Sequence, residues 1–174
     1  MKSKENIVFL GMMGSGKTSI GLLVSKKLNL KFFDIDKCIE EQQNMKISKI
    51  FKEKGEKFFR NFEEKVTIEF LKKENTVIAL GGGAFLNKNI RNEILNNHFS
   101  FWLKWDNNIL INRIKKSPQR PIAYNASTEK LNKLIKTRSH LYSLADNKVN
   151  CNNLSKTQIV NRIIKLYENK KNNN

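Results

Sequence analysis

A glycine-rich segment near the N-terminus restricts the fold of this chain more than any other feature. Residues 7–10 (IVFL) form a short apolar run, residues 11–18 read GMMGSGKT, and residues 17–28 carry apolar side chains spaced along one helical face. This order predicts a buried strand, a loop with unusual dihedral angles, and a helix that begins where the loop ends. A strand that leads directly into a helix is typical of α/β domains with a parallel sheet.

Strand-like and helix-like segments alternate along the rest of the chain. Further strands are expected at 31–36, 76–80, 98–105 and 148–150, and helices at 37–74 with an interruption near Gly55, 88–96, 107–116, 128–145 and 155–168. The alternation predicts a three-layer α/β fold, in which a central parallel sheet of about five strands has helices on both faces. Residues 1–168 are expected to form a single domain with a mobile loop at about 114–127, followed by a disordered tail at 169–174. Trp102 and Trp105 are expected in the core.

Composition excludes several classes of protein. No apolar run approaches the roughly 20 residues of a membrane span, and the N-terminal MKSKEN leaves no room for a signal peptide before IVFL. Cys38 and Cys151 lack the spacing of metal ligands and fit a reduced chain, so a cytoplasmic protein is expected. The net charge of +17 comes almost entirely from 27 lysines spread over the chain, which favours solvated surface charge over a localised nucleic-acid site.

Residues 11–18 fit the pattern G-x-x-x-x-G-K-[ST] of a phosphate-binding loop. Successive backbone N–H groups and the N-terminus of the following helix would surround a phosphate with positive potential. Lys17 would reach the β- and γ-phosphates, and the hydroxyl of Thr18 would ligate Mg²⁺. The motif therefore implies ATP or a similar purine nucleotide together with Mg²⁺, but it does not identify the phosphoryl acceptor. The residues expected to bind the nucleotide here are Gly14, Ser15, Gly16, Lys17, Thr18 and Ser19.

Two carboxylates end the second expected strand. Alternation along an extended strand would put Asp34 and Asp36 on the same side, near the carboxyl edge of the sheet where ligands bind in this class of fold. Asp34 would then hold the metal through water, and Asp36 would accept a proton from an attacking hydroxyl. Alternatively, Asp36 only caps the helix that follows it.

A second glycine cluster follows the third expected strand, where residues 77–85 read VIALGGGAF. The two glycine-rich stretches hold six of the eight glycines of the chain. Glycine is favoured where a ligand approaches the backbone closely or where the chain needs unusual dihedral angles. The cluster is therefore either part of a second binding site or a flexible turn between strand and helix.

Arginine is rare, with 6 Arg against 27 Lys. Because lysine serves wherever any cation is sufficient, the remaining arginines are expected where a planar, bidentate donor is needed. Arg60 lies four residues after Glu56 and three before Glu63, on one face of a helix. Taken alone, this spacing indicates an exposed ion pair.

Six segments, in this order and at these spacings, resemble the shikimate kinase family over essentially the full chain. They are GMMGSGKTSIG (11–21), DID (34–36), GEKFFRNFEE (55–64), GGGAF (81–85), QRPIA (119–123) and TRSHLYSLAD (137–146). The resemblance implies a P-loop kinase fold in which the loop at about 114–127 is a lid. It also implies transfer of the γ-phosphoryl group of ATP to the 3-hydroxyl of shikimate.

The resemblance implies a site for shikimate, a small cyclic carboxylate with three hydroxyls. A planar carboxylate calls for arginine forks, a role that the family pattern gives to Arg60 and Arg138, with Glu63 orienting Arg60. Asp36 would be the base, and Phe51 and Phe59 would be either walls of the site or core residues. The implied substrate-binding set is Asp36, Arg60, Gly81, Gly82, Gly83 and Arg138.

The resemblance also extends the nucleotide site beyond the loop. Arg113 matches a position that stacks on adenine, and Arg120 matches the lid arginine that closes over the transferred phosphate and acts in catalysis with Lys17. The lid reads RPIA where a larger aliphatic residue often follows, which leaves the detail of its closure open. No adenine contact can be assigned in the Asn-rich segment after Val149. The expected partners are ATP and shikimate, with neither nucleic acid nor membrane, in a monomer.

Two other functions remain open from the residues alone. A related kinase could phosphorylate another small hydroxylated acid such as gluconate, although the pair Arg60 and Arg138 and the triple glycine disfavour it. The basic charge could instead serve a nucleotide-dependent nucleic-acid binder, whose binding would be sensitive to salt.

Overall fold

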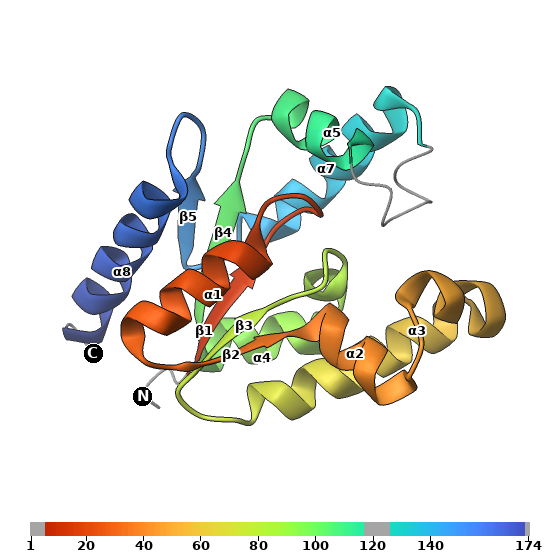
Figure 1. Ribbon diagram of the computed structural model, residues 1–174, viewed down its shortest axis with the longest axis horizontal. Helices are drawn as coiled ribbons and strands as arrows, with labels where there is room; N and C mark the ends of the chain where they lie inside the picture. The colour runs from red at the N-terminus through yellow and green to blue at the C-terminus, as the bar shows by residue number, and fades with distance from the viewer. Residues whose placement is uncertain (1–5, 117–125, 173–174) are drawn as a thin grey trace.

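Five parallel strands form the centre of the molecule, as the sequence predicts (Figure 1). The computed structural model describes residues 6–116 and 126–172. The strands lie in the order β2-β3-β1-β4-β5, and every neighbouring pair is parallel. Their bounds are β1 Ile7–Leu10, β2 Lys31–Asp34, β3 Thr76–Ala79, β4 Phe99–Lys104 and β5 Asn147–Asn150.

Helices cover both faces of the sheet and complete the predicted three layers (Figure 1). α1 (Lys17–Leu28) and α8 (Lys156–Asn172) pack on one face. The other face carries α2 (Ile35–Gln43), α3 (Ile47–Leu71), the short 3₁₀ helix η1 (Ala84–Leu86), α4 (Lys88–Asn97), α5 (Asn107–Lys115) and α7 (Thr128–Tyr142).

The central strand is buried on both faces, which explains why it reads as a continuous apolar run. Ile7 and Phe9 belong to the cluster that includes α1 and α8, while Val8 and Leu10 belong to the cluster on the opposite face. Parallel strands end at one edge of a sheet, so the segments that follow β1, β2, β3 and β4 meet there. This edge carries the glycine loop after β1 and the glycine cluster after β3.

The boundary between β2 and α2 corrects the expectation for the two carboxylates. The strand ends at Asp34, not at residue 36, because the Asp34 side chain accepts from the backbone N–H of Lys37 and caps α2. Asp36 lies in the first turn of α2. Strand alternation therefore does not relate the two side chains, and the predicted capping role belongs to Asp34 instead of Asp36.

The helical region predicted at 37–74 is divided twice. The predicted interruption at Gly55 is present, with φ 80° and ψ 169° inside α3. A second break, which the sequence analysis did not anticipate, separates α2 from α3, where Asn44 adopts a left-handed conformation at φ 45°.

The C-terminal helix runs further than expected. α8 continues to Asn172, so residues 169–172 are helical and not a disordered tail. Lys170 contributes to this extension, because its Nζ lies 3.9 Å from the Asp146 carboxylate and donates to the Asp146 carbonyl at 3.4 Å.

Most of the predicted lid, including Arg120 and the segment RPIA, lies outside the described residues. Within the two described ranges, no helix combines the length and apolar character that crossing a membrane requires.

Candidate active site

The loop between β1 and α1 has the dihedral angles that its glycines predict. Gly11, Gly14 and Gly16 have φ values of 142°, 77° and 90°, in the region that disfavours other residues. Gly16 is also the N-cap of α1, and no described side chain caps the helix there. A helix N-terminus without a described side-chain cap, preceded by a glycine loop, is the arrangement used for phosphate binding.

Lys17 lies inside this loop. Its Nζ donates to the carbonyls of Gly11 at 2.9 Å and Met12 at 3.0 Å, and only 8% of the residue is exposed. The ammonium group is thus held within the backbone that would enclose a phosphate, where water screens its charge little. Ser15 is also buried, whereas Ser19 is exposed on the first turn of α1.

A hydroxyl and a carboxylate meet where the first turn of α1 approaches the end of β2. Thr18 Oγ1 donates to Asp34 Oδ2 at 2.5 Å. Hydroxyl and carboxylate oxygens are the ligands that Mg²⁺ uses when substrate phosphates complete its coordination. The pair fits the predicted metal site, and the part of the chain that the structure describes has no cluster of three or more His, Cys, Asp or Glu able to hold a metal.

The glycines after β3 leave space for charged side chains. Neither Gly81 nor Gly83 has a positive φ. A Cβ at Gly81 would lie 2.6 Å from Glu63 Oε1 and 2.7 Å from Asp36 Oδ1, and a Cβ at Gly83 would lie 2.6 Å from Arg60 Nη1. These distances are too short for a real Cβ, so glycine allows three charged side chains to pack directly on the backbone.

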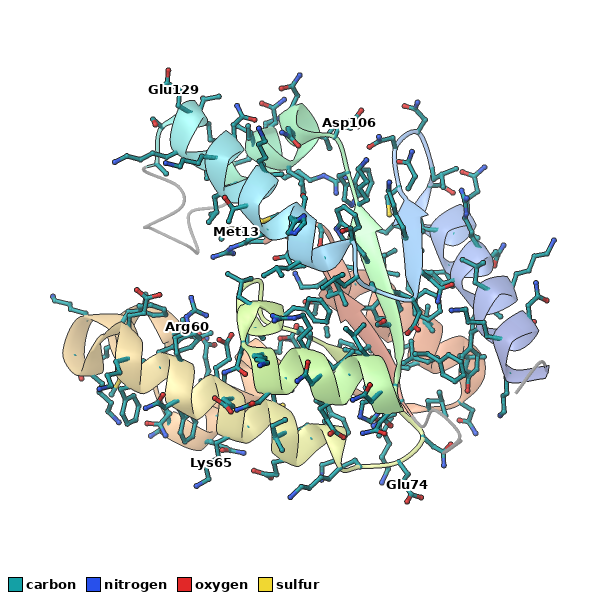
Figure 2. The ribbon with its side chains drawn as sticks, turned by 180° about the vertical axis from the view of Figure 1, so that it is seen from behind. Met13, Arg60, Lys65, Glu74, Asp106 and Glu129 are labelled. Atoms are coloured by element: carbon teal, nitrogen blue, oxygen red, sulfur yellow. The ribbon has the colours of Figure 1, made fainter. Side chains whose placement is uncertain are left out.

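Two carboxylates and two aromatic rings hold Arg60. Its Nη1 donates to Glu63 Oε2 at 2.7 Å, and its Nε and Nη2 lie 3.4 Å from Glu56 Oε1. The guanidinium carbon lies 5.1 Å from the ring centre of Phe59 and 5.9 Å from that of Phe51, within the range of cation–π attraction. Phe59 is a core residue and Phe51 is partly buried. Figure 2 shows Arg60 rising from α3 on the side of α7.

α7 contributes a second arginine to the same glycine cluster. Arg138 Nη1 donates to the Gly82 carbonyl at 3.0 Å, and the Tyr142 hydroxyl donates to the same oxygen at 2.5 Å. Because Arg60 packs against Gly83, the two predicted carboxylate-binding arginines lie at neighbouring backbone positions. Sequence reasoning missed Tyr142, although its position one helical turn after Arg138 indicates a side chain on the same face.

The pKa of Glu63 depends on its burial and on the charges of Asp36, Arg60 and Arg138. Only 3% of the residue is exposed, and its Oε1 has no hydrogen-bond partner among the described residues. Burial raises the pKa of Glu63, the charge and hydrogen bond of Arg60 oppose that rise, Asp36 adds to it, and Arg138 lowers it. The four side chains therefore share one electrostatic environment.

Arg113 lies beside the loop at the end of α5, but its partner in the structure is an aromatic side chain. Its guanidinium carbon lies 3.7 Å from the ring centre of Trp105, and its Nη1 donates to the Gly14 carbonyl at 3.4 Å. The expectation of a core position is confirmed for Trp102, which is 6% exposed. It is incomplete for Trp105, since this partly buried indole donates from Nε1 to the Ser15 carbonyl at 2.9 Å.

Comparison with known proteins adds a family match. The family model for shikimate kinase matches residues 13–168. A shikimate kinase from Sulfurihydrogenibium sp. (strain YO3AOP1) is 38% identical over 160 residues, 92% of this chain and 96% of that protein. The structure of shikimate kinase from Acinetobacter baumannii in complex with shikimate has a TM-score of 0.90 at 28% identity, covering 98% of this chain and 96% of that chain. A gluconokinase from Sinorhizobium meliloti 1021 shares only the fold, with a TM-score of 0.57 at 14% identity over 97% of each chain.

Proposed function

The chain belongs to the shikimate kinase family, and from this premise we propose how its residues carry out the reaction. The enzyme transfers the γ-phosphoryl group of ATP to the 3-hydroxyl of shikimate and yields shikimate 3-phosphate and ADP. Of the three functions that the residues left open, this one is supported by relatives over most of the chain.

Shikimate binds at the glycine cluster in this proposal. The observation that carries the assignment is that Arg60 packs against Gly83 while Arg138 donates to Gly82, so two forked donors stand at adjacent backbone positions. A carboxylate bound there would be held by planar, charge-assisted hydrogen bonds. Glu63 holds Arg60 in place through its 2.7 Å contact. The ring hydroxyls would then lie near Asp36 and the backbone of Gly81.

Asp36 is the base in this proposal. Its carboxylate lies against Gly81, at the sheet edge that also carries the phosphate-binding loop. It would accept the proton of the 3-hydroxyl as the oxygen attacks the γ-phosphorus. Lys17 and Arg120 would stabilise the negative charge of the transferred group, and the bond to the β-phosphate oxygen of ADP would break in line. Positioning of the two substrates accounts for most of the catalysis in such a reaction.

We propose that Thr18 holds Mg²⁺ directly and that Asp34 holds it through water. The metal would neutralise charge on the β- and γ-phosphates. Thr18 and Asp34 would exchange their mutual hydrogen bond for these contacts, and Asp34 would keep its capping contact with Lys37.

We also propose that the protein is a cytoplasmic monomer of one domain. The buried, unpaired thiols of Cys38 and Cys151 support a reducing compartment. Size-exclusion chromatography with light scattering tests the oligomeric state, and a mass near 20.3 kDa is expected.

The experiment that tests the function measures ADP release by the purified protein with ATP and Mg²⁺. Shikimate is expected to stimulate ADP release strongly, whereas gluconate is not. Asp36→Asn should still bind both substrates, but its kcat should be lower than that of the parent by about 100-fold or more. ATP binding without shikimate-dependent turnover would overturn the proposed acceptor, and near-normal kcat in Asp36→Asn would overturn the role of the base.

A further inference from the structure

We propose that Trp105 is a positioning residue for the nucleotide, which fixes both Arg113 and the Ser15–Gly16 peptide before ATP binds. The proposal rests on the proposed function only in that the loop binds a nucleotide. It does not depend on the identity of the acceptor.

The fold brings Trp105 to the loop. Trp105 follows the last residue of β4, and β4 pairs in parallel with β1, whose Leu10 lies opposite Trp102. The segments after both strands therefore emerge at the same edge of the sheet. The indole packs against the hydrophobic clusters on both faces of the sheet, so its ring is held from two sides.

One contact of Trp105 orients a peptide of the loop. Its Nε1 donates to the Ser15 carbonyl at 2.9 Å. In a trans peptide the C=O and N–H groups point in opposite directions. Holding the Ser15 carbonyl toward the indole therefore turns the Gly16 N–H away from the indole. A backbone N–H at a helix N-terminus is the type of donor that binds phosphate.

A second contact fixes the arginine at the end of α5. The Arg113 guanidinium lies 3.7 Å from the centre of the Trp105 ring, and its Nη1 also reaches the Gly14 carbonyl at 3.4 Å. Guanidinium groups stack on aromatic faces. Arg113 is exposed, so the face away from Trp105 can receive a purine as a third layer.

The two contacts lower the entropic cost of binding. An exposed arginine has many rotamers, and a glycine loop has many backbone states, and both must be restricted when a nucleotide binds. Trp105 restricts both before binding. Nucleotide affinity should therefore depend on Trp105, while shikimate affinity should not.

The chain offers a matched control for this aromatic side chain. Tyr167 on α8 is also partly buried, carries the Lys171 ammonium at 5.9 Å from its ring, and packs edge-on against Phe99 at 5.2 Å. Phe99 begins β4, whereas Trp105 follows the end of β4, so the control lies at the opposite end of the same strand. Tyr167→Leu therefore removes a comparable contact far from the loop.

The test is calorimetric titration of the full chain with ADP, with shikimate in a separate titration. Trp105→Leu should weaken ADP binding about tenfold, the combined size of one hydrogen bond and one cation–π contact. Trp105→Phe keeps a ring under Arg113 but lacks the N–H donor. Its loss of ADP affinity should therefore be smaller than that of Trp105→Leu but still measurable. Tyr167→Leu should keep ADP affinity within about twofold, and shikimate affinity should stay within the same range in all three variants.

Unchanged ADP affinity in Trp105→Leu would overturn the proposal. An equal loss of shikimate and ADP affinity would also overturn it, because such a loss indicates that the substitution disturbs the whole fold. If Trp105→Leu does not fold, Trp102→Phe leaves Trp105 as the sole tryptophan of the chain. Its fluorescence should then change with ADP but not with shikimate, and the absence of a response to ADP would overturn the proposal. A parent protein that binds ADP without shikimate-dependent turnover would contradict the proposed function and leave this inference intact.

Discussion

Asp36, Glu63 and Arg60 reach a common site because Gly81 and Gly83 have no side chains. A Cβ at either position would lie within 2.7 Å of one of these charged groups. The missing side chains of Gly81 and Gly83 therefore leave the space that these charged groups occupy. At the residue scale, a change at a glycine should consequently reproduce the loss of the charged group beside it.

Gly83→Ala should displace the Arg60 guanidinium and raise the KM for shikimate about tenfold or more, while the KM for ATP stays within about twofold. Stability should change little, because the displaced atoms are the end of a flexible side chain that is 37% exposed. Arg60→Lys should have a similar effect, since a point charge cannot replace the fork. Steady-state kinetics of both variants and of the double variant provides the measurement. Fully additive effects would show that the two residues do not act together.

Glu63→Gln should weaken shikimate binding without lowering the free energy of unfolding at neutral pH. Burial raises the pKa of Glu63 in the folded protein, so folding favours the protonated form. The free energy of unfolding is then greatest below the usual glutamate pKa, and it falls as the pH rises through the interval up to the raised pKa. Glutamine cannot ionise, so the variant should lose this part of the pH dependence and be at least as stable as the parent at neutral pH.

Urea unfolding at several values between about pH 4 and pH 8 measures this effect. The same variant should show a higher KM for shikimate, because a neutral amide holds Arg60 less firmly than a carboxylate does. An unfolding free energy that depends on pH as it does in the parent would mean that another group is responsible.

At the element scale, the bend in α3 determines how the aromatic rings and Arg60 are arranged. Gly55 interrupts the helix at φ 80° and ψ 169°, and Phe51 precedes the bend while Phe59 follows it. The two rings nevertheless pack at 4.5 Å between centres, and Arg60 lies over both. The sequence predicted the interruption, because a single glycine in a charged helical segment marks a break. It did not predict that the bend brings two rings under one cation.

Gly55→Ala should lower the free energy of unfolding by about 1–3 kcal/mol, because these dihedral angles are nearly exclusive to glycine. Apart from its chain neighbours and the adjacent helix backbone, no atom of the described residues lies within 4 Å of the added Cβ, so the cost comes from the backbone conformation and not from a clash. Urea unfolding measures this loss. The control is Lys57→Ala, a substitution of an exposed residue on the same helix, which should change the free energy of unfolding by less than about 0.5 kcal/mol. Equal stability of Gly55→Ala and the parent would contradict the backbone argument.

At the scale of the whole molecule, the sheet separates two hydrophobic clusters, and each contains one cysteine. Cys38 belongs to the cluster beneath α2 and α3, and Cys151 belongs to the cluster beneath α1 and α8. Burial raises the pKa of Cys38 to about 11 and that of Cys151 to about 12. Each thiol therefore reports on the opening of one face of the sheet.

Both thiols should resist alkylation at about pH 8, since the thiolate is the reactive form. If the chain unfolds as a single domain, both should become reactive with the same opening free energy as urea is added. Mass spectrometry of alkylated Cys38→Ser and Cys151→Ser follows each thiol separately. If the opening free energy that exposes one thiol were several kcal/mol lower than that of the other thiol, the two faces of the sheet would unfold independently.

The sequence by itself determined the local features of this protein. A glycine loop between an apolar run and a helix predicted a phosphate-binding loop, and apolar runs alternating with helical patterns predicted a parallel sheet, because both signals lie in the spacing of residues that are close together in the sequence. Tertiary structure decided which side chains meet. Asp34 rather than Asp36 caps α2, Tyr142 reaches Gly82 across 60 residues, and Trp105 joins Ser15 across 90. Such contacts depend on where packed helices and paired strands place their ends. The spacing of residues along one segment does not predict these positions.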